Sequence, residues 1–428
     1  MKKIILSIAV SMLFLSIRLQ ASGFQINEHN ARVMAMGGAF AGLANDPSAV
    51  YYNPAGITQL FGTHFSLGAT YISPTSTFTG PAPSTTESKL KKKFFTPANF
   101  YFTQSLGSNF FVGFGFNDPF GLGTEWEDDW VGRYRTTKTE IKTYNFSPVV
   151  AYKISDMLSV SAGFTVSYAD VLIGRKLQLL VPVGQTVVQL PDANLELKGH
   201  NTAFGYTAGL LFKPMDNLGL GVAFHSQIKY DMKGDATTTV SPTTPAAVVA
   251  ALPKGSITAP LTTPAVLTIG GSYRVFSSLL FNADYQYNGW SSYDKLEVNF
   301  NDLPKSSTNP SVSVRDYKNS YILRAGSEYI LNDQVALRGG ILFDKNPIKD
   351  EKLDPTLPDA DRWAFNIGFG YKFTPNFSVD VAYMYLLFKD RTIDTSEEFI
   401  PIRPIPQRLN GTYKSSANLF GVNLSYSL

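Results

Sequence analysis

The chain of 428 residues contains no cysteine. This absence excludes structural disulfides, and with them a disulfide-scaffold fold, and it also excludes thiolate chemistry. After the first residues, no stretch reaches the roughly 18 consecutive apolar residues that a membrane-spanning helix needs. The mature sequence therefore has neither a disulfide framework nor a membrane-spanning helix.

Enzyme motifs are also missing. The sequence has no Gly-x-Ser-x-Gly, no His-Glu-x-x-His and no phosphate loop. The four histidines are scattered and suggest no metal cluster: His29, His64, His200 and His225. A lipase with a Ser/His pair on distant strands is the remaining enzymatic alternative, and no feature of the sequence supports it. We expect no enzymatic activity, no metal and no cofactor.

The N-terminus has the three parts of a secretory signal peptide. A basic start at residues 1–3 precedes the apolar run Ile4–Leu15, and Ala21 offers a small residue for cleavage. We therefore predict that residues 1–21 are a signal peptide. Its three basic residues account for the formal net charge of +3, so the mature chain is close to neutral and the basic balance is no sign of a nucleic-acid partner.

The mature sequence is dominated by a period of two. Between residues 377 and 386, apolar and aromatic side chains occupy every odd position, while Asp380 lies on the other face. The same alternation occurs in residues 158–168, 363–371 and 420–428. Successive side chains of a strand point to opposite faces, so these segments are strands with one apolar side.

Strand length and aromatic content favour a membrane barrel over a soluble β-sandwich, which would show the same alternation. The strands are about 10 residues or longer, which suits a tilted membrane crossing. Phe, Tyr and Trp make up 13% of the chain and gather near the strand ends, where membrane interfaces place them. A closed barrel would also satisfy every backbone group in lipid.

Short turns recur along the chain and allow the strands to be counted. Each turn has an aromatic residue, then polar residues or proline, then a new strand; they lie at residues 102–109, 152–156, 212–216, 273–277, 329–333 and 371–375. Long segments rich in Pro, Thr, Ser and Gly separate them, which is the asymmetry of outer-membrane barrels. Six turns and two outer strands predict an all-β fold, a 14-stranded antiparallel barrel over residues 61–428.

Residues 22–60 do not follow this pattern. They are rich in Gly, Ala and small polar residues, and Asp46 followed by Pro47 is typical of a helix N-cap with proline at the first helical position. We predict that this segment is a hatch that fills the barrel lumen. The alternative is a disordered periplasmic tail, although the apolar content is high for disorder.

Two stretches of sequence resemble a known family. The first combines Ser22–Glu28, Gly37–Ala39, Ala44–Ala49 and Asn53–Gly56, and the second combines Asp118–Thr124 and Trp130–Tyr134. In this order and spacing they resemble the FadL/TodX family of outer-membrane transporters for long-chain fatty acids and aromatic hydrocarbons. The resemblance implies a fourteen-stranded barrel with an N-terminal hatch, and sideways passage of substrate through a kink in the third strand.

That kink would follow the strand at residues 110–116. The resemblance places it at Asn117, Asp118, Pro119, Phe120 and Gly121. The hatch and gating residues it implies are Asp46, Asn53, Pro54 and Ala55. Pro54 fixes φ and removes a donor, so the triplet is either a simple linker to the first strand or an anchor that lets a ligand shift the hatch.

Apolar residues in two connecting segments are candidates for substrate capture, because exposed apolar clusters usually mark binding sites. One set is expected in the longest extracellular loop and the other in the preceding loop: Ala246, Val248, Val249 and Leu252, and Val181, Val183, Val187, Val188 and Leu190. The family is known for an apolar capture groove in these two loops. The alternative is loop packing without a ligand.

A fatty carboxylate would need an inward-facing cation. Arg324 and Arg338 lie on polar faces of neighbouring strands and are the candidate carboxylate partners, but Glu328 and Asp344 face the same way. A ladder of ion pairs in the lumen is therefore the competing interpretation. Arg133 matches the family motif but lies in a loop, where its role is structural or functional.

These observations predict an outer-membrane channel for long-chain fatty acids or related hydrophobic compounds. The alternatives are a transporter of monoaromatic hydrocarbons and an adhesin whose loops bind a surface ligand while the barrel is an anchor. A general porin is disfavoured by the hatch. We expect the partners to be hydrophobic small molecules, membrane lipid, lipopolysaccharide and the barrel-assembly machinery, and we expect a monomer.

Overall fold

The computed structural model describes residues 23–306, 309–400 and 407–428. The predicted signal peptide, residues 1–21, lies outside the described residues. Within the described residues, no helix has both the length and the apolar character needed to cross a membrane.

Among the described residues, fourteen antiparallel strands form one closed ring, as predicted. The third, seventh and eighth are each divided into two segments. Their bounds, in ring order, are β1 (Thr63–Thr79), β3 (Ala98–Ser105), β4 (Phe110–Asn117) with β5 (Gly121–Glu125), β6 (Lys138–Lys153), β7 (Leu158–Val183), β8 (Thr186–Met215), β9 (Leu218–His225) with β10 (Ile228–Thr239), β11 (Gly255–Thr263) with β12 (Val266–Phe276), β13 (Leu279–Asn288), β16 (Ser320–Ile330), β17 (Val335–Asp344), β18 (Arg362–Thr374), β19 (Phe377–Phe388) and β23 (Gly411–Ser427). β1 pairs with β23 from His64 to Thr79 and closes the ring.

The alternation of side chains explains why these segments form a wall. In β18, Trp363, Phe365 and Ile367 are 47%, 50% and 64% exposed, while Ala364 and Asn366 are buried. The exposed face is therefore the apolar one, and the buried face carries small and polar side chains. This inversion of the usual soluble pattern is the arrangement expected of a sheet whose outer face meets lipid.

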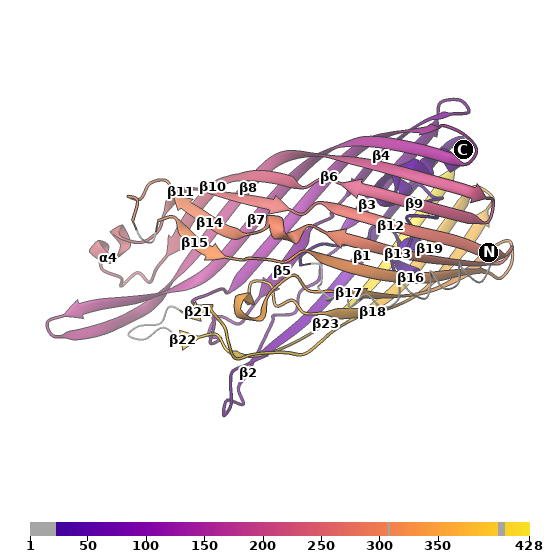
Figure 1. Ribbon diagram of the computed structural model, residues 1–428. Coiled ribbons are helices and arrows are strands. Elements are labelled where there is room, and N and C mark those ends of the chain that lie inside the picture. The colour runs from indigo at the N-terminus through magenta and orange to yellow at the C-terminus, as the bar shows by residue number, and fades with distance from the viewer. Residues whose placement is uncertain (1–22, 307–308, 401–406) are drawn as a thin grey trace, which may run out of the picture.

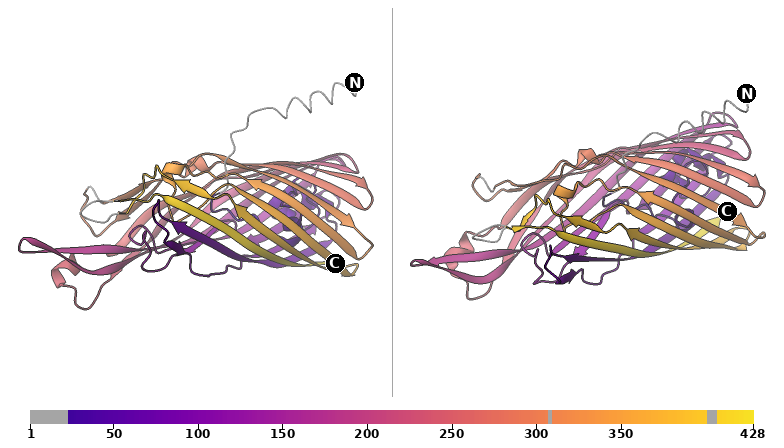
Figure 2. Two further views of the ribbon diagram at one scale, coloured as in Figure 1. Left: turned by 90° about the horizontal axis from the view of Figure 1, so that it is seen from below. Right: turned by 60° about the horizontal axis from the view of Figure 1, so that its bottom comes forward.

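All six predicted short turns join neighbouring strands at one end of the barrel. The other end carries the long connections and the strands that extend past the ring (Figures 1 and 2). These connections contain β2 (Glu87–Lys89), α4 (Ala246–Ala250), η3 (Trp290–Ser292), β14 (Lys295–Phe300), β15 (Ser311–Val314), η4 (Asp350–Lys352), β20 (Arg391–Ile393), β21 (Phe399–Ile400) and β22 (Gln407–Arg408).

Two predictions about these connections were wrong. The connection that holds Ala246 to Leu252 is not the longest, because the connection between β13 and β16 is longer and folds into η3, β14 and β15. Residues 181–190 are not a loop: β7 and β8 continue as a hairpin to a tight turn at Gly184, whose φ is +62°. A run of β-branched valines favours extended backbone, so the strands do not stop where the wall ends.

The N-terminal segment, here residues 24–60, lies inside the ring of strands (Figure 1). It forms α2 (Ala31–Ala35), α3 (Ala49–Tyr52) and the 3-10 helix η2 (Pro54–Gln59). α2 contacts the strands from β17 to β1, and η2 contacts β4, β6, β7 and β8, so the segment touches opposite parts of the wall. Most of its side chains are buried.

The helix after Asp46 begins later than predicted. Ser48, not Asp46, directly precedes α3, and the Ser48 side chain makes no cap hydrogen bond. Asp46 instead accepts hydrogen bonds on Oδ1 from the backbone N–H and the hydroxyl of Ser48, at 2.9 and 2.5 Å. Through these bonds the carboxylate stabilises a turn that leads into the helix. Its other oxygen is held by Arg32 at 2.9 Å.

Candidate functional site

The third strand of the barrel is broken at the residues where a kink was expected. β4 ends at Asn117 and β5 begins at Gly121, and both pair with β6. β3 pairs with β4, and no ladder pair joins it to β5 within the described residues. Pro119 has no N–H to donate, which suits a residue that interrupts a ladder.

The N-terminal segment occupies this break. Ile26 donates its backbone N–H to the Pro119 carbonyl at 2.9 Å, and Gly121 donates to the Phe24 carbonyl at 3.0 Å. The ring of Phe24 packs against Trp290 with centroids 4.7 Å apart. Residues 24–26 thus replace the missing ladder neighbour, which ties the N-terminus to the break.

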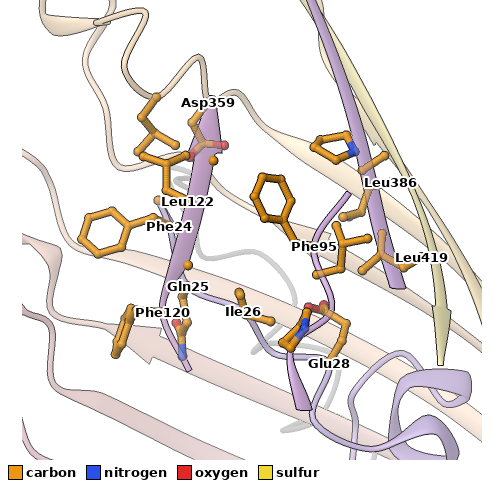
Figure 3. A pocket seen from close by; sticks show the side chains of 18 of the residues that line it. Phe24, Gln25, Ile26, Glu28, Phe95, Phe120, Leu122, Asp359, Leu386 and Leu419 are labelled. Atoms are coloured by element: carbon orange, nitrogen blue, oxygen red, sulfur yellow. The ribbon is translucent and has the colours of Figure 1, made fainter. Parts of the chain in front are cut away.

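A cavity of about 470 Å³ lies beside the break (Figure 3). Its walls come from the N-terminal segment, the connection before β3, β5 and β6, and the ends of β17, β18, β19 and β23. Most of the lining is apolar: Phe24, Ile26, Phe94, Phe95, Leu122, Ile141, Ile322, Leu342, Leu386, Phe388 and Leu419. This size and composition suit an apolar ligand.

The polar side of this first cavity carries more acids than unpaired cations. Glu28, Asp344 and Asp359 line it beside Arg362, whose Nε donates to Asp344 at 2.8 Å. Burial raises the pKa of Asp359, a loop residue, to about 7, against the opposing effect of Arg362. A carboxylate ligand would meet no free guanidinium at this side.

A second cavity of about 140 Å³ lies nearer the long connections. It shares Phe24, Leu122, Ile141 and Leu357 with the first cavity, so the two adjoin. Its further apolar lining comes from Val171, Ile173, Leu197, Met232, Ile257, Ala259, Leu261, Leu296, Val298 and Phe300. Together the two cavities form a continuous apolar region inside the upper barrel.

Three arginines line the second cavity, and they differ in their partners. Arg135 and Arg315 both pair with Asp354, and Arg135 also pairs with Glu398. Burial alone would raise the pKa of Asp354, but these two guanidinium groups hold that pKa well below its usual range. The side chain of Arg175 on β7 makes no hydrogen bond or ion pair with any described residue.

Arg175 was not predicted from the sequence. It lies in the alternating stretch Val171-Leu172-Ile173-Gly174-Arg175, where a single cation among apolar residues was the available signal. Whether such a cation is free depends on where the acids of distant loops fall, and periodicity does not encode that. Arg175 is therefore a guanidinium of this region that is available to a ligand, beside Lys233 of β10, which also lines the second cavity.

Asn53 joins the N-terminal segment to the wall. Its amide donates to the carbonyls of Ala41 and Leu210 at 2.8 and 3.0 Å, and its Oδ1 accepts from Ala55 N–H at 3.3 Å. Pro54 starts η2, and Ala55 is fully buried in it. The structure therefore brings this triplet against β8, as an anchor would require, and not into a free linker.

The two predicted carboxylate partners do not line either cavity. Arg338 is held by Glu328 and Asp380, each at 2.7 Å, which is the ion-pair ladder considered as the alternative. Arg324 donates to Gln286 at 2.7 Å. Asp344 belongs to the first cavity instead, through Arg362.

The predicted capture residues lie on two projections at the long-loop end (Figure 1). Val183 and Val187, at the hairpin tip, are 57% and 65% exposed, and α4 has no buried residue. None of the nine residues lines a cavity among those found in the described residues. Arg133 is held by Asp192 at 3.3 Å and stacks on Tyr134, a structural arrangement.

Curated proteins similar in sequence are outer-membrane proteins. Outer membrane protein P1 of Haemophilus influenzae is 29% identical over 98% of this chain and 98% of its own length. The long-chain fatty acid transport protein of Escherichia coli O6:H1 is 27% identical over 89% of this chain and 90% of its own.

Solved structures share the fold. A Pseudomonas aeruginosa FadL homologue superposes with a TM-score of 0.84 at 22% identity, over 95% of this chain and all of the other. The toluene transporter TodX of Pseudomonas putida superposes with a TM-score of 0.67 at 16% identity, over 96% and 99% of the two chains.

Residues 12–428 match the family described as outer membrane protein transport protein (OMPP1/FadL/TodX). The match spans nearly the whole chain and agrees with the closed barrel and its apolar cavities. The family consists of transport channels and not of enzymes. The protein belongs to the OMPP1/FadL/TodX family of outer-membrane transport proteins and resides in the outer membrane.

Proposed function

We propose that this protein imports long-chain fatty acids across the outer membrane. The observation that carries the proposal is Arg175, a cation without a partner among the described residues, at the edge of an apolar cavity. A guanidinium recognises a carboxylate by charge-assisted hydrogen bonds, and an apolar cavity accepts an alkyl chain. The name of the Escherichia coli relative, a long-chain fatty acid transport protein, is consistent with this assignment.

In the proposed path, the substrate is captured at the long-loop end and enters the second cavity. It moves from there into the first cavity and leaves sideways at the break between Asn117 and Gly121. The N-terminal segment acts as a hatch, anchored by Asn53, that yields to the ligand. The hydrogen bonds of residues 24–26 to the break support this role, because a ligand in the first cavity would touch both.

A monoaromatic hydrocarbon is the second candidate substrate. The acid-rich side of the first cavity favours a neutral ligand over a carboxylate, since four acids line this cavity against two cations: Glu28, Asp118, Asp344 and Asp359 against Lys142 and Arg362. The adhesin alternative rests on the exposed hairpin tip and α4, which project beyond the wall. Neither alternative gives Arg175 a role.

The test is uptake of labelled oleate and labelled toluene by cells whose own transporter is deleted. The variants are Arg175→Gln and Arg175→Lys, with Lys176→Gln as the matched control, because Lys176 is the next residue of β7 and faces away from the cavity. A hydrogen bond to a charged group contributes about 1.5–3 kcal/mol. We therefore expect Arg175→Gln to reduce oleate uptake by about 10-fold or more, with Arg175→Lys intermediate and toluene uptake unchanged.

Toluene uptake without oleate uptake would keep the transport path and change the substrate. Equal oleate uptake by wild type and Arg175→Gln would remove the carboxylate assignment. If neither compound entered while folded barrel was present in the outer membrane, the adhesin alternative would replace the transport proposal.

A further inference from the structure

The wall of the barrel has a second discontinuity, between the sixth and seventh strands. On one edge, β8 pairs with β9 from Thr207 to Met215 and with β10 from Asn194 to His200. No ladder pair joins residues 201–206 of β8 to residues 228–232 of β10 in the described structure. We call this stretch the β8–β10 seam; in the direction of the chain, β8 runs first beside β10 and then beside β9 (Figure 1).

The seam exists because two adjacent strands bend away together. The seventh strand is interrupted at Ser226 and Gln227, and the eighth at residues 264–265, while β9 stays paired with β12 and β10 with β11. At the lower end of the seam, Ser226 exchanges hydrogen bonds with Tyr206, through its N–H and its hydroxyl, both at 2.9 Å. Above that point two backbone edges face each other without ladder bonds, which lipid does not tolerate unless other groups cover them.

On its inner side the seam is closed by side chains. Tyr230 reaches from β10 to β7, where its hydroxyl lies 2.6 Å from that of Ser167. Ile228 packs close to Gly205, because a Cβ built on that glycine would approach Ile228 Cγ1 to 2.9 Å. Ala203, Tyr230 and Ile228 are buried in the same apolar cluster as Phe24 and Phe120.

The apolar cavities reach this inner side. Met232, at the upper end of the seam, lines the second cavity. Gly205 and Ile228, at the lower end, line a small cavity of about 30 Å³ together with Phe120 from the broken third strand. Cavities therefore reach the inner side of the seam at both of its ends, and buried side chains fill the space between them.

On its outer side the seam opens into a notch of about 420 Å³. The notch is lined by Asn201, Thr202, Ala203, Phe204, Gln227, Lys229 and Asp231. Phe204 and the adjacent Tyr206 are 62% and 60% exposed, as aromatic residues of a membrane interface would be. Lys229 and Asp231 form no ion pair with a described residue, so the notch combines aromatic rings on the β8 edge with unpaired charges on the β10 edge.

We propose that the β8–β10 seam is a second side opening of the channel. Hydrophobic molecules pass through it between the outer-leaflet interface and the apolar cavities, and Tyr230 is the side chain that closes it. The proposal rests on the proposed transport of such molecules. The seam is separated from the third-strand break by β6, β7 and β8, and opening it breaks side-chain contacts but no ladder hydrogen bonds.

The absence of cysteine from the chain allows a direct test. The double variant Thr202→Cys with Asp231→Cys places exposed thiols on the two edges of the seam, and a cleavable bifunctional methanethiosulfonate reagent joins them. The matched control is Asn194→Cys with Thr239→Cys, an exposed pair that is already in register where β8 and β10 are laddered and that lines neither cavity. Uptake of labelled oleate is measured before cross-linking, after it, and after reduction.

We expect cross-linking across the seam to reduce uptake several-fold and reduction to restore it, while the control pair shows no change. Equal uptake before and after complete cross-linking of Thr202→Cys with Asp231→Cys would overturn the proposal. A loss in both pairs would also overturn it, because the effect would not belong to the seam. If the double variants and the wild type all fail to import oleate before cross-linking, the proposed function fails; the same cross-linking series with labelled toluene then decides on the seam.

Discussion

Arg32 lies at the centre of a buried chain of five charged side chains that joins the N-terminal segment to the wall. Its guanidinium holds Glu328 at 2.9 Å and Asp46 at 2.9 Å, and Glu328 in turn pairs with Arg338, which pairs with Asp380. Removing one member of a buried ion pair leaves an uncompensated charge, at a cost of about 3–5 kcal/mol. Arg32 is therefore one of the side chains that fix the orientation of the N-terminal segment.

We expect Arg32→Met to lower the urea midpoint of the purified barrel in detergent and to make the N-terminal segment accessible to protease. Arg32→Lys should restore only part of the loss, since an ammonium cannot bind Glu328 with two parallel hydrogen bonds as Arg32 does. Lys414→Gln is the control, because the Lys414–Asp390 pair is largely exposed and contributes little. If Arg32→Met were as stable as wild type, Arg32 would not hold the N-terminal segment against the wall.

Asp359 gives the first cavity a pH dependence. Burial, reinforced by Asp344 and opposed by Arg362 and Arg391, raises its pKa to about 7, against an unfolded value of about 4. The folded state thus binds the proton of Asp359 more tightly than the unfolded state does. The contribution of this proton to the stability of the folded barrel is complete below pH ~4 and is lost as the pH rises through about 7. In Asp359→Asn, the loss of stability between pH 5 and pH 8 should shrink, by up to about 3 kcal/mol relative to wild type, because this window covers about two of the three pH units that separate the folded and unfolded pKa values.

Urea titration of the reconstituted barrel at the two pH values measures this effect. Asp302→Asn serves as the control, because Asp302 accepts hydrogen bonds from Ser256 at an exposed site. Parallel pH profiles for wild type and Asp359→Asn would show that Asp359 does not titrate in this range.

At the scale of elements, the N-terminal segment fits the wall because glycines line the inner faces of the strands it touches. A Cβ on Gly221 of β9 would lie 1.8 Å from the Ala41 carbonyl oxygen, and one on Gly209 of β8 would lie 2.5 Å from Asn53 Oδ1. Gly199 of β8 lies outside this contact, and a Cβ there would be 3.5 Å from its nearest neighbour. The N-terminal segment therefore packs against the wall at positions where only glycine lets the two come so close.

We expect Gly221→Ala to push the segment away from β9, at a cost of about 1–3 kcal/mol for overpacking, and to raise the conductance of the barrel for small ions. Gly199→Ala should leave both properties unchanged. Single-channel recording in planar bilayers measures the conductance. Indistinguishable traces for the two variants would show that the segment is not held by this contact.

Strands were predictable from the sequence where one face meets lipid and the other meets the lumen. Residues 377–386 and 363–371 fall within β19 and β18, with the apolar face outward as expected. The interruptions at Ser226 and in the eighth strand were not predictable, because both halves keep the period of two. The kink at Pro119 was expected through family resemblance, and proline supplies a local cause for it that Ser226 does not.

The candidate site was predictable only in part, for a related reason. Asn53 was singled out by its motif, and its amide donates hydrogen bonds to the carbonyls of Ala41 in the segment and Leu210 in β8. Arg324, Arg338 and Arg175 all lie on strands of the wall, and the sequence does not distinguish them. Their roles depend on acids that other strands and loops bring near, such as Glu328 for Arg338 and Asp354 for the neighbours of Arg175.

At the scale of the whole molecule, most hydrogen bonds between the strands of the wall do not involve the N-terminal segment. The ring is closed by β1 and β23, and the segment adds side-chain contacts to a ladder that is already paired around most of its circumference. The break at residues 118–120 is the place where the segment supplies ladder bonds of its own. The barrel should therefore fold without the segment, while the lumen should not stay closed.

Deleting residues 24–60 tests this separation. We expect the shortened protein to retain a heat-modifiable folded band and to show a several-fold higher single-channel conductance, because a 14-stranded ring leaves an aqueous lumen when nothing fills it. Oleate uptake should become insensitive to Arg175→Gln, since an open lumen bypasses the cavity at that residue. A folded deletion variant with wild-type conductance would mean that the long connections, and not the N-terminal segment, close the channel.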